Sequence, residues 1–75
     1  MRRKPRPVFE TGQEVVIKRL PDRYKRYHKQ PERLLGARGQ IYHVVQGDRY
    51  VVYLVKLANG ERLDLSASYL RATDR

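Results

Sequence analysis

The chain of 75 residues carries a formal net charge of +9 and is 40% hydrophobic, which is enough for one small domain with a modest core. Because it contains no cysteine, disulfide bonds, thiolate zinc sites, iron–sulfur clusters and cysteine nucleophiles are excluded. The longest apolar run, 50–55, is too short for a membrane span, and prolines interrupt the only segment that starts like a signal peptide, so we expect a cytoplasmic protein.

Residues 1–7 are predicted to form a flexible basic arm ahead of a single domain over 8–75. The arm has two prolines and no acid, and its bases are Arg2, Arg3, Lys4 and Arg6. Basic arms of this kind fold onto nucleic acid or reach into one of its grooves. The alternative, a terminus without a role, stays open at this point.

A first strand is predicted over 14–18, where Val15 and Ile17 alternate with polar residues. Leu20-Pro21 ends this strand. The connection that follows, over 18–35, is polar, basic and long for so small a domain. Connections of that length are usually functional or mobile.

Within this connection, Pro21-Asp22 can open a short helix that Pro31 ends. Residues 31–35 can add one more turn, closed by Gly36. Three side chains are expected on one side of the helix: Leu20, Tyr24 and Tyr27.

The second half of the chain has the composition and alternation of β-structure. Further strands are predicted over 40–46, 49–57, 61–66 and 69–72. Tight turns are expected at Gly47-Asp48 and at Asn59-Gly60, and residues 66–68 suggest a 3-10 turn before the last strand.

Alternation divides the strand over 40–46 between two faces. One face is expected to hold Ile41, His43 and Val45, and the other Tyr42 and Val44. The strand over 49–57 is rich in β-branched and aromatic residues, which is typical of a central strand covered on both faces. In the strand over 61–66, Leu63 and Leu65 should point inward.

These elements make an all-β domain of five short strands in meander order. Short twisted strands bury one face by curling into a small barrel. A long basic loop after the first strand and a 3-10 turn before the fifth are the layout of an SH3-like barrel, which is the predicted fold.

Two short patterns resemble the KOW-type element of translation and transcription proteins. They are Phe9-x-x-Gly12-Gln13-x-Val15-x-Ile17 and Gly36-x-x-Gly39-x-Ile41. Over roughly 9–72 the chain is similar to the archaeal and eukaryotic large-subunit ribosomal protein family with an SH3-like barrel. Arg26-Tyr27-His28 stands in the loop that is basic in that family, and the resemblance implies contact with ribosomal RNA through the tail and this loop.

The chain departs from the family by an insertion at 31–35 and by having Arg38 as the one base beside the glycine step. The barrel also resembles small subunits of photosynthetic electron-transfer complexes, such as the variable chain of ferredoxin–thioredoxin reductase. That likeness implies docking to a protein partner.

The excess charge lies in two blocks, 1–7 with net +4 and 18–33 with net +5, while the rest of the chain sums to zero. Two blocks of positive charge create a field that attracts anions. The candidate nucleic-acid-binding residues are Arg2, Arg3, Lys4, Arg6, Lys18, Arg19, Arg23, Tyr24, Lys25, Arg26, Tyr27, His28, Lys29, Arg33 and Arg38. The lysine and arginine side chains would contact phosphates. The rings of Tyr24, Tyr27 and His28 would stack on unpaired nucleobases. Alternatively, the tyrosines close one end of the barrel and the charges are merely solvated.

No metal, cofactor or catalytic site is expected. His28 and His43 alone do not make a metal site, and His43 is more simply a barrel residue. The Gly36–Gly39 step lacks the Gly-Lys-Ser/Thr ending of a phosphate-binding loop and is predicted to be a strand-entry kink. No acid pair or activated serine indicates an enzyme.

We therefore expect a small nucleic-acid-binding barrel, with RNA or the ribosome favoured over DNA. The alternative is a basic docking subunit that seats on an acidic protein or a larger complex. No membrane partner is expected, because no basic amphipathic helix is present.

Overall fold

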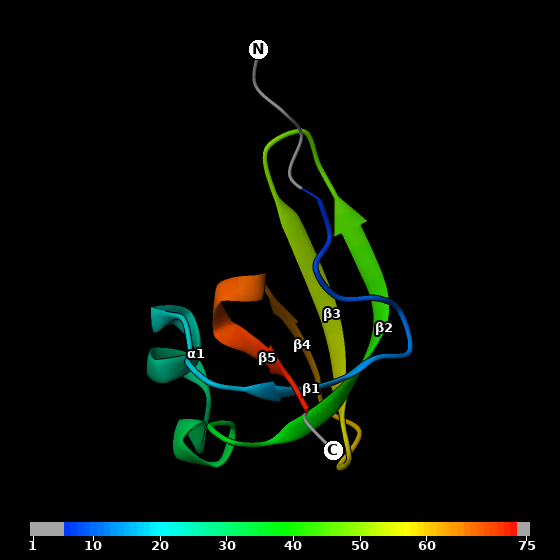
Figure 1. Ribbon diagram of the computed structural model, residues 1–75. Helices are drawn as coiled ribbons and strands as arrows, with labels where there is room; N and C mark the ends of the chain where they lie inside the picture. Colours follow the sequence, from blue (N-terminus) through cyan, green and yellow to red (C-terminus); the bar gives the residue numbers. More distant parts are fainter. Residues whose placement is uncertain (1–5, 74–75) are drawn as a thin grey trace.

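A computed structural model describes residues 6–73, in which five antiparallel strands form one sheet (Figure 1). The elements in chain order are β1 (Glu14–Ile17), α1 (Asp22–Tyr27), the 3-10 helix η1 (Pro31–Arg33), β2 (Arg38–Gln46), β3 (Val51–Leu57), β4 (Arg62–Leu65), the 3-10 helix η2 (Ala67–Tyr69) and β5 (Leu70–Ala72). The predicted helix, 3-10 turn and strands are all present within one to three residues of their expected ends.

The strand order β4-β3-β2-β1-β5 confirms the SH3-like barrel. Strands β1 to β4 form a meander, and β5 returns to pair with β1 through Ile17 and Leu70. In Figure 1 the β2–β3 hairpin extends beyond the other strands, and the segment before β1 runs beside it. The connection between β1 and β2 folds back as α1 and η1 on one side of the barrel.

The core is built from alternate residues of each strand and from the β1–β2 connection. Val15 and Ile17 of β1 are fully buried, as the alternation predicts. The other strands contribute Ile41, Tyr53, Val55, Leu57, Leu63, Leu65 and Leu70. Leu20 and Leu34, on either side of α1 and η1, join the same cluster, so the connection closes one end of the barrel.

The predicted faces of β2 are wrong beyond Ile41, because the strand bulges. Ile41 pairs with Val55 and His43 with Leu54, so β2 has one extra residue here. The extra residue reverses the alternation, and Val44 then packs against the core while His43 and Val45 are exposed. His43 is therefore a surface residue and not a core residue.

Strand β3 was predicted to be covered on both faces, but only one of its faces is fully buried. Tyr53, Val55 and Leu57 are buried, whereas Val52 and Leu54 on the opposite face are half-buried. Tyr53 is the largest fully buried side chain. Its hydroxyl accepts the Val8 N–H at 2.8 Å, which ties the start of the domain to the middle of the sheet.

Candidate nucleic-acid interface

The basic connection between β1 and β2 is fastened to the barrel at both ends. The Gly36 N–H donates to the Ile17 carbonyl at 2.8 Å, and the Ile17 N–H donates to Ala37 at 3.0 Å. Gly36 has a φ of 79°, a conformation that side chains other than glycine rarely adopt, so this residue closes the η1 turn as predicted. The backbone of the connection is thus held in a defined conformation on the barrel.

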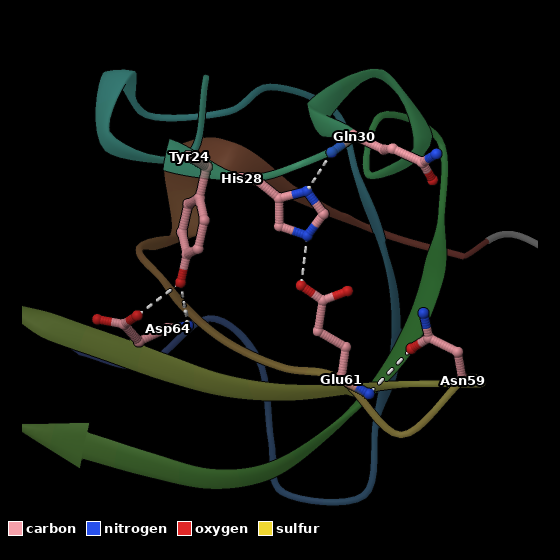
Figure 2. A network of polar contacts seen from close by, with 6 residues as sticks. All are labelled: Tyr24, His28, Gln30, Asn59, Glu61 and Asp64. Atoms are coloured by element: carbon pink, nitrogen blue, oxygen red, sulfur yellow. Dashed lines mark hydrogen bonds and ion pairs between the residues drawn. The ribbon is translucent and has the colours of Figure 1, made fainter. Parts of the chain in front are cut away.

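Tyr24 holds α1 on β4 (Figure 2). Its hydroxyl donates to Asp64 Oδ1 at 2.7 Å and accepts the Asp64 backbone N–H at 3.1 Å. Arg23 reinforces the contact, because its guanidinium lies 3.1 Å from Asp64 Oδ2 and donates to the Asp64 carbonyl at 2.6 Å. The Arg23 guanidinium also lies over the Tyr24 ring, 4.9 Å from its centroid.

These contacts shift the pKa values of both Tyr24 and Asp64. Burial, together with the hydrogen bond to Asp64, raises the pKa of Tyr24 above 10.0. Burial alone would raise the pKa of Asp64, but the Tyr24 hydrogen bond and the Arg23 charge outweigh it and lower that pKa below 3.8. Tyr24 therefore stays protonated, and Asp64 stays ionised at neutral pH.

The lowered pKa of Asp64 predicts a small stabilisation that acid removes. A folded-state pKa below the unfolded value means that the contribution is complete above pH 3.8 and is lost as the pH falls through the folded-state pKa. Because Asp64 is half-exposed, we expect about 0.5–1 kcal/mol or less. The free energy of unfolding of Asp64→Asn should be lower than that of the natural protein at pH 6 and should converge with it toward about pH 2. The control is Asp22→Asn, which also removes one negative charge, but from α1. If the difference in the free energy of unfolding between Asp64→Asn and the natural protein stayed constant with pH, the prediction would be contradicted.

His28 fastens the far end of α1 to the β3–β4 hairpin (Figure 2). Its Nδ1 accepts the Gln30 N–H at 3.0 Å, which assigns the ring proton to Nε2. Nε2 lies 2.5 Å from Glu61 Oε2, so the ring donates to that carboxylate. Asn59 in turn accepts the Glu61 N–H at 2.9 Å and shapes the hairpin.

Tyr27 does not share the side of α1 that faces the barrel, contrary to the expected grouping with Leu20 and Tyr24. The helix ends at Tyr27, and the extended residue His28 makes the next barrel contact. The Tyr27 side chain is 82% exposed. Of the three rings predicted to stack on bases, it is the one that makes no ring contact or hydrogen bond to the described residues.

The predicted cations fall into two groups. Arg19 and Arg23 are engaged internally, Arg19 through the Ser68 carbonyl at 3.1 Å and the Tyr69 ring. The remaining cations of the connection and of the start of β2 are exposed and form no ion pair with the described residues: Lys18, Lys25, Arg26, Lys29, Arg33 and Arg38. Arg6 is also exposed, whereas the predicted Arg2, Arg3 and Lys4 lie outside the described residues.

Two grooves flank the folded connection. One, of about 400 Å³, runs between η1 and the β3–β4 hairpin and is lined by His28, Arg33 and Arg38 among others. The other, of about 360 Å³, is lined by Lys18, Lys25 and the half-exposed Leu35 among others. Four of the free cations therefore line concave surfaces, namely Lys18, Lys25, Arg33 and Arg38.

Two cations beside these grooves were missed by the sequence analysis. Arg71 of β5 and Lys56 of β3 line hollows that also include Arg38. Single bases on strands do not stand out in a sequence, because strand pairing alone brings them beside the basic connection. Their alternation with inward residues is the only signal that could have marked them.

Among residues 6–73, no group of three histidine, aspartate or glutamate side chains is placed to hold a metal ion. His28 and His43 do not come together in one site, since His28 is held by Glu61 and His43 is on the exposed face of β2. No helix in that part of the chain is long and apolar enough to cross a membrane.

Comparison of the chain with protein-family models, curated proteins and solved structures found no match. The resemblance to KOW-type elements and to the ribosomal barrel family stays a prediction.

Proposed function

We propose that this protein is a cytoplasmic RNA-binding barrel that contacts phosphates through the connection between β1 and β2 and through the N-terminal arm. One observation carries the proposal: the connection is held on the barrel by Tyr24, His28 and Leu34, while its remaining cations are exposed. Three of these cations, Lys18, Lys25 and Arg33, line two grooves beside the connection. Because the backbone of the connection is already ordered, it loses little conformational freedom when a polyanion binds.

The exposed cations of the connection outnumber the acids beside them. On β4 and its hairpin, Asp64 is paired with Arg23, and Glu61 accepts a hydrogen bond from His28. Asp22 and Glu32 are the acids within the connection itself, and five exposed cations of the same segment outnumber them. A surface of one dominant sign steers RNA toward it and makes binding depend on salt.

The exposed Tyr27 gives this surface a stacking side chain. Unpaired bases stack on such rings at about 1–3 kcal/mol each. Single-stranded or looped RNA offers unpaired bases and duplex DNA does not, so RNA is the favoured ligand.

Fluorescence polarisation with labelled single-stranded RNA, hairpin RNA and duplex DNA tests the proposal. With about five phosphate contacts, the logarithm of the affinity should fall with the logarithm of salt at a slope of about −3.5 to −4.5. Lys29→Gln/Arg33→Gln should make that slope shallower by about 1.5, because two contacts are lost. Arg49→Gln/Arg62→Gln removes the same charge from two residues that line neither groove and is the matched control.

The two double variants separate a binding site from general charge. Equal loss of RNA binding in both, or binding that disappears by about 150 mM salt, would overturn the proposal. Docking to an acidic protein would then be the function to test.

A further inference from the structure

The outer face of β1 carries a buried valine between two arginines. Val15 and Ile17 point into the core, so Val16 points to the opposite face, yet it is only 5% exposed and is not part of the core cluster. Its register partners are Arg38 of β2 and Arg71 of β5. The apolar stems of these side chains can cover Val16 while their guanidinium groups stay in solvent.

The two arginines line one hollow. With β1 between them and adjacent strands about 4.8 Å apart, their Cα atoms are separated by about 10 Å, a distance that two arginine side chains can close from either side. A hollow of about 250 Å³ is lined by Val16, Gly36, Arg38, Arg71 and Thr73. Like charges placed this close repel each other unless an anion lies between them.

The other polar groups of the hollow are already used. The Gly36 N–H donates to Ile17, and the Thr73 hydroxyl donates to the Glu14 carbonyl at 3.3 Å. The Glu14 carboxylate is on the same face of β1 but lines the neighbouring groove, and neither arginine forms an ion pair within residues 6–73. The donors that the hollow offers to a ligand are therefore the two guanidinium groups.

We propose that Arg38 and Arg71 together hold one phosphate group over Val16. A guanidinium presents two parallel N–H donors to a phosphate, so two of them can grip a single anion from opposite sides. The inference deepens the proposed function, because an RNA backbone phosphate is the source it favours; free phosphate shares the same chemistry and is separated from it by experiment.

The site is tested first without RNA. In a titration of the full chain with inorganic phosphate and with dimethyl phosphate at constant ionic strength, the backbone amide signals of Val16, Arg38 and Arg71 should shift and saturate. The shifts should disappear in Arg38→Gln/Arg71→Gln and persist in the control Arg49→Gln. Arg38→Lys/Arg71→Lys keeps the charges and the apolar stems but loses the paired donors, so it should weaken binding without unfolding the protein. Absence of saturable shifts with both probes would overturn the site.

A double-mutant cycle with RNA tests whether the arginines share one phosphate. Arg38→Gln and Arg71→Gln should each weaken RNA binding by about tenfold, because each removes a charged hydrogen-bonded contact. The double variant should lose clearly less than the product of the two effects, since both act on one anion. Additive losses would overturn the shared site.

The outcomes for the two proposals differ. If RNA binding were weakened by Lys29→Gln/Arg33→Gln but unchanged by Arg38→Gln/Arg71→Gln, this inference would be overturned and the proposed function would stand. If the phosphate probes bound saturably but no RNA bound, the phosphate site would stand and the proposed function would be overturned. A response to inorganic phosphate but not to dimethyl phosphate would assign the site to free phosphate.

Discussion

Replacing Tyr53 by alanine is expected to leave most of the protein unfolded at room temperature. Tyr53 is 1% exposed in the middle of β3, where it faces Val44 and Leu65 on the neighbouring strands. Its ring meets the ring of Phe9 edge to face, with centroids 5.3 Å apart. Truncation of a buried aromatic side chain costs about 3–5 kcal/mol. A barrel of this size has a total stability of about 3–5 kcal/mol, so little remains.

Tyr53→Phe separates packing from hydrogen bonding. It keeps the ring and removes only the hydroxyl that accepts the Val8 N–H, so we expect a loss of about 1 kcal/mol. Urea unfolding followed by circular dichroism measures both variants. If Tyr53→Ala unfolded cooperatively and were as stable as Tyr53→Phe, the Tyr53 ring would contribute little to the stability of the core.

Gly39→Ala is expected to destabilise the protein by about 1–3 kcal/mol, because it overpacks a closed site. Gly39 is a buried position of β2, and an added Cβ would lie 2.5 Å from Val55 Cγ1 and 3.1 Å from the Lys56 carbonyl oxygen. Val55 is fully buried and the carbonyl belongs to a paired strand, so neither can move away. The midpoint of urea unfolding measures the loss.

Gly47→Ala is the matched control. Its added Cβ would also lie 2.5 Å from a neighbour, but that neighbour is the ring of Tyr50, which is 57% exposed at the hairpin turn. The ring can swing into solvent, so the change should be within about 0.5 kcal/mol. Equal losses at the two glycines would contradict the view that mobility of the neighbour sets the cost.

The two glycines of the predicted strand-entry step differ in their physical role. Gly36 is needed for its positive φ, since an added Cβ there would meet nothing within 4 Å. Gly39 is needed for space. Both were visible in the sequence as a Gly-x-x-Gly spacing, but the reason for each depends on the strands that pack beside it.

Strand positions and turns were predictable because alternation and turn residues act over a few neighbouring positions. The bulge between Ile41 and His43 was not, because it is a property of pairing with β3. One extra residue there moved Val44 toward the core and His43 to the surface. A pattern of period two in a single strand carries no information about such a shift.

The candidate site divides in the same way. The sequence by itself determined that the excess charge lies in the arm and in the connection after the first strand, because charge is a property of composition. Only the tertiary structure decided which side chains stay available, because the partners of Tyr24 and His28 are 40 and 33 residues away. Strand pairing likewise brought Arg38 and Arg71 to either side of Val16. Local preferences determine which elements form, whereas the register between distant strands determines which charged groups meet.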